Sequence, residues 1–242
     1  LPDYLPIFLL DGTKYLISCD TTTSTAAVLS RLATETGLSP EFCDQFGLFI
    51  VKKSDSLQYS VVRWLMNFES PLLVLSQVRS ETHTPHKVVL RKSYWHTSYE
   101  SVLLNDRIAC RFLYAQCLSD VENGHIEVSD AVRQRLEYLG NQGSFREYVK
   151  LCQIQGNYGC LMFDSCRSDF PLPGTSILPM AVNKHIVFRY INDIGQATSS
   201  AFAITKMRSW RLINRGNGEF WLSFEYYMAR RHFEWITLES EQ

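Results

Sequence analysis

Few residues of this chain have types and spacings that could support catalysis or metal binding. His83 and His86 stand three apart in HTPH, a spacing seen in metal sites, but no cysteine or acidic cluster accompanies them in this polar loop. The sequence contains no GxSxG, HExxH, GxxxxGKS/T or GxGxxG motif. A Cys/His nucleophile pair could be recognised only in space. We therefore expect no enzyme activity, no metal and no cofactor.

The cysteines favour free thiols over a disulfide framework. Their number, 7, is odd, their spacing is irregular, and no CxxC pair occurs. No Asn-x-Ser/Thr sequon is present either. Together these features predict a cytosolic chain in a reducing compartment.

A cluster of basic and aromatic residues lies near the end of the chain. Lys206, Arg208, Arg211 and Arg215 follow one another along a predicted strand, with Trp210 among them. Such a strand could bind nucleic acid, but the net charge of −1 favours a solvated strand face and no nucleic-acid partner. Strict alternation would put Arg208 and Trp210 on one face and Arg211 on the other. Some of these charges could also meet an acidic peptide.

The elements that carry this cluster are predicted to be an antiparallel meander. Three runs, FAITKMRSWRLI, EFWLSFEYYM and FEWITL, are rich in aromatic and β-branched residues, are joined by tight turns, and contain one tryptophan each. No covering element follows before Gln242, so the sheet is expected to expose an apolar face and an open edge. Such a module is suited to bind an extended partner.

Three modules are predicted along the chain. In residues 1–80, Asp11-Gly12 marks a hairpin, and a helix follows Ser24 and ends at Gly37. The runs at 46–53, 59–65 and 71–78 are predicted strands. This order of elements is that of a ubiquitin-like or other small α+β domain. Residues 87–155 predict a helical bundle. Residues 157–242 predict about seven strands of a β-sandwich or barrel.

The helices of the second module have clear start signals. Asp106 is expected to cap a helix over 107–122, and Ser129 to start a second helix. Ser144 and Glu147 form a capping-box pattern for a third. No linker-like stretch separates the three modules, so we expect one compact body. No apolar run is long enough to cross a bilayer, and the start at Leu1 without Met indicates a fragment.

Several stretches resemble the FERM-like region of the sorting nexin 17 group of PX-FERM proteins. In the second lobe they are VVLRKSYW at 88–95, YAQCLSD at 114–120 and GHI at 124–126. In the third they are YGCLMFD at 158–164, MRSWR at 207–211 and FEYYM at 224–228. The resemblance covers essentially the whole chain. It implies an α+β, three-lobed FERM-like module with a ubiquitin-like F1 lobe (1–80), a helical F2 lobe (87–155) and a phosphotyrosine-binding-like F3 lobe (157–242) without its C-terminal helix.

The resemblance also implies a function. Members of the group are cargo adaptors, peripheral on early endosomes, that bind Asn-Pro-x-Tyr or Asn-x-x-Tyr signals in the cytoplasmic tails of transmembrane receptors and support receptor recycling. The peptide adds as a strand to the F3 lobe, here at 207–213, and Trp210 matches the family's peptide-contacting tryptophan. A PX domain that binds membrane phosphoinositide would precede Leu1.

The expected peptide-binding residues are Met207, Arg208, Ser209, Trp210, Arg211, Leu212 and Ile213. Trp210 and Leu212 share one strand face and would supply the apolar anchor, although Trp210 could instead pack in the core. Two other functions stay open. A small-GTPase effector would need basic residues on the second strand, where only Lys14 lies, and a phosphoinositide-binding membrane module would need a clustered basic surface.

Overall fold

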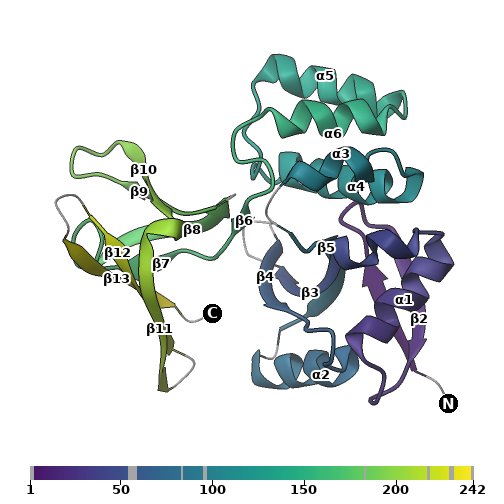
Figure 1. Cartoon of the computed structure of the whole chain (residues 1–242), viewed down its shortest axis with the longest axis horizontal. Coiled ribbons are helices and arrows are strands. Elements are labelled where there is room, and N and C mark those ends of the chain that lie inside the picture. The colour runs from purple at the N-terminus through teal and green to yellow at the C-terminus, as the bar shows by residue number, and fades with distance from the viewer. Residues whose placement is uncertain are drawn as a thin grey trace. The chain divides into compact units, whose positions relative to one another are not determined.

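The computed structural model describes residues 3–53, 59–82, 84–94, 97–182, 184–216, 219–228 and 232–240. The chain divides into two compact units, Leu1–Tyr158 and Gly159–Gln242 (Figure 1). His83 lies outside the described residues.

The first unit begins with a five-stranded mixed sheet. Its strands are β1 (Asp3–Phe8), β2 (Lys14–Cys19), β3 (Phe46–Lys53), β4 (Tyr59–Trp64) and β5 (His86–Lys92), in the order β2-β1-β5-β3-β4. The predicted hairpin at Asp11-Gly12 is confirmed, because β1 pairs antiparallel with β2 and Gly12 has a φ of 86°. Helix α1 (Thr25–Thr36) starts where expected. Ser24 Oγ accepts from the Ala27 N–H, and Gly37 ends the helix with a φ of 77°.

Two expectations for this region are corrected. The apolar run at 71–78 is not a strand but part of helix α2 (Pro71–Thr82). Ser70 precedes a proline at the first helical position, and Val74, Leu75 and Val78 are buried at helical spacing. The stretch from Lys87, expected in the second lobe, lies instead in β5 at the centre of the first sheet, parallel to β1 and antiparallel to β3.

The helical part of the first unit follows the sheet. It contains α3 (Glu100–Leu103), α4 (Arg107–Glu122), α5 (Asp130–Asn141) and α6 (Phe145–Gln153); short 3-10 turns lie at η1 (Pro40–Gln45) and η2 (Thr97–Tyr99). The caps at Asp106 and Ser129 form as predicted. The side chain of Ser144 makes no cap hydrogen bond, so the helix at α6 is confirmed but its capping box is not.

One apolar core runs through the first unit. The same cluster of buried side chains includes residues of the sheet, such as Leu48, and residues of α4 and α6, such as Leu113 and Val149. Phe46 of β3 meets Phe112 of α4 edge to face, with ring centroids 5.3 Å apart. The sheet and the helices therefore stabilise one another by burying a shared surface.

The second unit is an eight-stranded antiparallel sheet. Its strands are β6 (Leu161–Met162), β7 (Cys166–Ser168), β8 (Thr175–Val182), β9 (His185–Ile191), β10 (Ala197–Ala203), β11 (Met207–Gly216), β12 (Glu219–Tyr227) and β13 (Phe233–Ser240). Seven of them form the path β10-β9-β8-β7-β13-β12-β11, and β6 pairs with β8. The run FAITKMRSWRLI, expected as one strand, is two, because η3 (Ile204–Lys206) separates β10 from β11.

The core of the second unit is aromatic. Phe188 of β9, Phe202 of β10 and Phe224 of β12 are buried and in mutual contact, with ring centroids 4.9 to 6.1 Å apart. Strands at opposite ends of the path thus face each other across one core, which is the arrangement of a sandwich.

Candidate functional site

Strand β11, which carries every residue of the predicted binding site, is an edge strand. It stands at one end of the strand path and, within the described part of the chain, pairs only with β12. The predicted meander is confirmed, since β11, β12 and β13 are consecutive and antiparallel. The outer edge of β11 therefore offers main-chain donors and acceptors to another strand.

The register of β11 determines which side chains point toward the core. Trp210 lies opposite Phe224 and Leu212 opposite Leu222, and directly opposed residues share a face. Phe224 is 1% exposed, so this is the inner face, yet Trp210 is 74% and Leu212 60% exposed. Trp210 is therefore not a core residue. Its side chain projects from the inner face of β11 into solvent instead of into the buried core.

Arg208 does not lie on the face that strict alternation predicts, because a β-bulge interrupts β11. The register shifts between Met207 and Ser209, so that Arg208 and Ser209 both reach Glu225. Arg208 Nε lies 2.7 Å from Glu225 Oε2, and its Nη2 also donates to Oε1. Arg208 therefore lies on the outer face, opposite Trp210, because a bulge breaks strict alternation. The hydrogen bond from Arg208 lowers the pKa of Glu225.

The outer face of this meander carries stacked arginines. The guanidinium of Arg211 lies 4.4 Å from the ring centre of Trp235, and that of Arg215 lies 4.4 Å from the ring centre of Trp221. Arg208 is placed similarly, 4.2 Å from the ring of Phe233. The three arginines of the basic cluster are thus held against aromatic rings on a sheet face.

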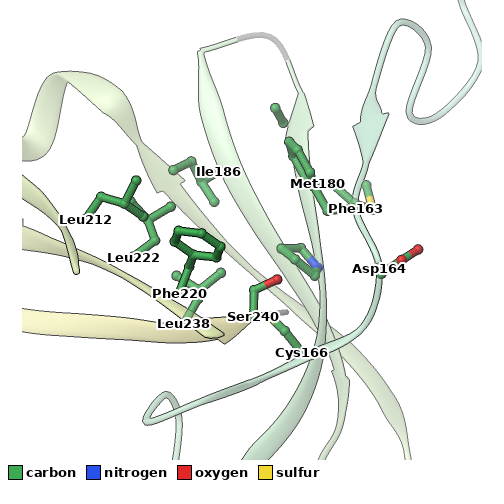
Figure 2. Close-up of a pocket in the computed structure, with 12 residues that line it drawn as sticks. Phe163, Asp164, Cys166, Met180, Ile186, Leu212, Phe220, Leu222, Leu238 and Ser240 are labelled. Atoms are coloured by element: carbon green, nitrogen blue, oxygen red, sulfur yellow. The ribbon is translucent and has the colours of Figure 1, made fainter. Parts of the chain in front are cut away.

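An apolar groove of about 300 Å³ adjoins the inner face of β11 (Figure 2). Leu212, Phe220, Leu222 and Leu238 line one side, and Met180 and Ile186 line the other. The remaining lining residues are Phe163, Asp164, Cys166, Pro179, Ala181 and Ser240. Leu212 belongs to both the edge strand and the groove, so the two features form one continuous site. Its surface suits apolar side chains.

Sequence reasoning placed the edge strand but missed the opposite wall of the groove. Met180 and Ile186 belong to β8 and β9, which are distant from β11 in sequence and in the strand path. The apolar runs ILPMAV and HIVFRYI that contain them signal strands, but nothing local indicates which strands face each other.

The other candidate residues are not gathered into a reactive site. His86 is buried, with Nδ1 2.7 Å from the carbonyl oxygen of Thr84. No group of His, Cys, Asp and Glu suited to a metal ion occurs among the residues that the structure describes. All of the cysteines are free thiols, and burial raises the pKa of Cys166 to about 11. In the described ranges, no helix combines the length and the apolar character needed to cross a membrane.

The fold is that of a FERM module. A mutant of the Dictyostelium discoideum myosin VII MyTH4-FERM MF2 domain has the same fold, with a TM-score of 0.68 at 11% identity over 100% of this chain and 59% of that chain. This likeness confirms the expected α+β, three-lobed FERM-like class.

Sequence similarity identifies the family. Models of the F1 lobe of the sorting nexin 17/27/31 FERM domain, the F2 lobe of the sorting nexin 17/31 FERM domain and the sorting nexin 17 FERM C-terminal domain match residues 3–95, 96–154 and 159–242. The chain belongs to this sorting nexin FERM family.

Two relatives show the extent of the similarity. Sorting nexin-17 of Rattus norvegicus is 32% identical over 253 residues, covering 98% of this chain and 53% of the relative. Human sorting nexin-31 is 30% identical over 209 residues, covering 86% of this chain and 47% of the relative. Within the group we expected the chain to be nearest to sorting nexin 31; the identities are similar for both members, and sorting nexin-17 matches more of the chain. It spans about half the length of the curated relatives it matches.

Proposed function

We propose that this chain is the cargo-binding module of an endosomal adaptor, and that β11 binds Asn-Pro-x-Tyr or Asn-x-x-Tyr signals from receptor tails as an added strand. The observation that carries this proposal is the exposed Trp210 on the inner face of an edge strand, next to an apolar groove. Membership of the sorting nexin family supports the wider role in receptor recycling at early endosomes.

Strand addition explains how such a site recognises varied tails. Main-chain hydrogen bonds to β11 supply affinity that does not depend on the sequence, and alternate side chains of the peptide face Trp210, Leu212 and the groove. Ordering a short peptide costs conformational entropy, so we expect a Kd of roughly micromolar, which corresponds to a binding free energy of about −8 kcal/mol.

Calorimetric titration with synthetic Asn-Pro-x-Tyr peptides tests the proposal. The chain should bind the peptide, Trp210→Ala should lose most of the affinity, and Phe68→Ala should not. Phe68 is a matched control, because it is an aromatic residue that is 83% exposed and belongs to the other unit. Equal affinity for Trp210→Ala and the unchanged chain would refute a role for this edge.

N-methylated peptides test the mode of binding. In an added strand only alternate peptide N–H groups face the edge of the sheet. Methylation at successive positions should therefore weaken binding at every second residue. A uniform response along the peptide would indicate that the peptide binds without pairing to a strand.

A further inference from the structure

Two of the three arginines on the outer face of β11, Arg211 and Arg215, are exposed cations of the edge strand without a carboxylate partner among the described residues. Arg211 is stacked on Trp235 of β13, two strands inward from β11, and Arg215 on Trp221 of the adjacent β12. Both side chains lie inward over the sheet in the unbound state, so each turns toward the free edge when it meets a molecule bound there. The remaining guanidinium N–H groups are donors for an anion.

These two arginines differ from Arg208 in their charge environment. Arg208 is neutralised by both carboxylate oxygens of Glu225. No carboxylate of the described residues lies within 4.0 Å of the guanidinium nitrogens of Arg211 or Arg215. Their charges are therefore available to a molecule that pairs with the edge.

The register of β11 places one of these charges between the two apolar anchors. Arg211 follows Trp210 and precedes Leu212, and it points to the face opposite them. In a strand added along this edge, successive side chains also alternate between the faces. The peptide residue opposite Arg211 is therefore flanked by two residues that face the side of Trp210 and Leu212.

We propose, building on the proposed function, that this site selects peptides with the pattern apolar–acidic–apolar upstream of the tyrosine motif. The acidic side chain pairs with Arg211 on the outer face, and the apolar side chains contact Trp210, Leu212 and the groove on the inner face. A second acidic residue, further along the strand, pairs with Arg215. The peptide's charge pattern thus discriminates among tails that share the same tyrosine motif.

A peptide fits this surface better than an anionic bilayer does. The two cations lie along a single strand, and the same face also carries Glu225 and Glu239, opposite Trp235 and Trp221 in register. Bilayer binding favours a broad basic patch, whereas an extended chain needs only a row of charges at its edge.

An aspartate walk tests the proposal. One Asp is moved through each residue upstream of Asn-Pro-x-Tyr in an otherwise constant Leu/Ala peptide, and Kd is measured by calorimetry with the whole chain. We expect affinity to alternate with a period of two residues, with the best Asp position about three- to fivefold tighter than Asn at that position. Arg211→Gln should abolish the Asp preference at the peptide position opposite Arg211, and Arg211→Glu should favour Lys at that position.

Arg167→Gln is the matched control. Arg167 is an exposed arginine on β7, separated from β11 by β13 and β12, so its loss removes the same charge without touching the edge. This variant should keep the full Asp preference. Equal loss in both variants would mean that the preference reflects only net charge, which overturns the pairing.

The outcomes also separate this inference from the function on which it rests. If the peptides bind in a Trp210-dependent manner without alternation in the Asp walk, the charge selection is wrong and the peptide-binding function stands. If no peptide binds, both the charge selection and the peptide-binding function are wrong. If Arg211→Glu instead abolishes sedimentation with phosphatidylserine-containing vesicles and leaves the Asp preference unchanged, the arginines serve a membrane and the inference is overturned.

Discussion

Lys92 Nζ lies 2.8 Å from Glu100 Oε1, and both side chains are almost completely buried. Lys92 ends β5 and Glu100 begins α3, so this ion pair joins the sheet of the first unit to its helices. Tyr94 donates to the same carboxylate oxygen at 3.1 Å, and Gln153 and Tyr158 donate to the other oxygen at 2.7 Å each. Four donors thus compensate the desolvation of one buried carboxylate.

Glu100→Gln should lower the free energy of unfolding by about 3 kcal/mol, because it leaves the ammonium of Lys92 buried without a counter-charge. Urea denaturation measures the effect. The sheet and the helices should unfold in one transition, since they share a core. Glu147→Gln is the matched control, because its pair with Lys150 is exposed and should contribute less than about 1 kcal/mol. Similar small losses in both variants would show that the buried pair has no special role.

Trp210→Ala should weaken binding of an Asn-Pro-x-Tyr peptide by about 2 kcal/mol or more, as for an aromatic hot spot. The thermal unfolding midpoint should change little, because a ring that is 74% exposed contributes little to the core. Calorimetry and thermal unfolding of the same protein preparation separate the two effects. A large drop in the midpoint would assign Trp210 a structural role.

All seven cysteines should react with a thiol reagent under denaturing, non-reducing conditions, since each is a free thiol. In the native state, Cys43 should react first, because it is only partly buried, and Cys166 should lag behind it, because burial raises the pKa of its thiol to about 11. Mass spectrometry after timed labelling measures both properties. Five or fewer labelled sites in the unfolded chain would indicate a disulfide.

The pair of Arg208 and Glu225 should stabilise the fold in a pH-dependent way. The hydrogen bond from Arg208 lowers the pKa of Glu225 from its ordinary value of 4.5. A carboxyl group with a depressed folded-state pKa contributes its full stabilisation above its unfolded pKa and loses it as the pH falls through the folded one. The difference in unfolding free energy between the unchanged chain and Arg208→Gln should therefore shrink as the pH is lowered from about 6 to about 3.

Glu225→Gln provides the comparison for this pH series. It has no carboxylate to protonate, so adding Arg208→Gln to it should give a difference that does not vary over the same range. A constant difference for the original pair as well would mean that the ion pair adds nothing to stability.

The local elements of this protein were predictable from its sequence. Asp11-Gly12 specifies a hairpin, and Ser24, Asp106 and Ser129 start helices by accepting backbone N–H groups. The alternation of apolar residues located the strands of the meander and put Trp210 with Leu212 on one face. These signals act over a few residues, so they can be recognised without knowledge of the fold.

Other features depended on contacts between distant segments. The run at 71–78 is apolar enough for a strand, and it becomes a helix because one side of it packs into the core of the first unit. A strand's place in a sheet also depends on its partners, which is why β5 belongs to the first sheet.

The candidate site depends both on local sequence signals and on contacts between distant segments. The sequence determined that Trp210 stands on an aromatic-rich strand, but only the strand order made β11 an edge and left the ring exposed. One bulge moved Arg208 to Glu225, on the other face from Trp210. Met180 lies across the groove from Leu212 because β8 and β11 face each other in space. Side-chain periodicity is a local property of the backbone, whereas strand pairing, bulges and facing sheets are set by packing of the whole chain, so only the tertiary structure could decide them.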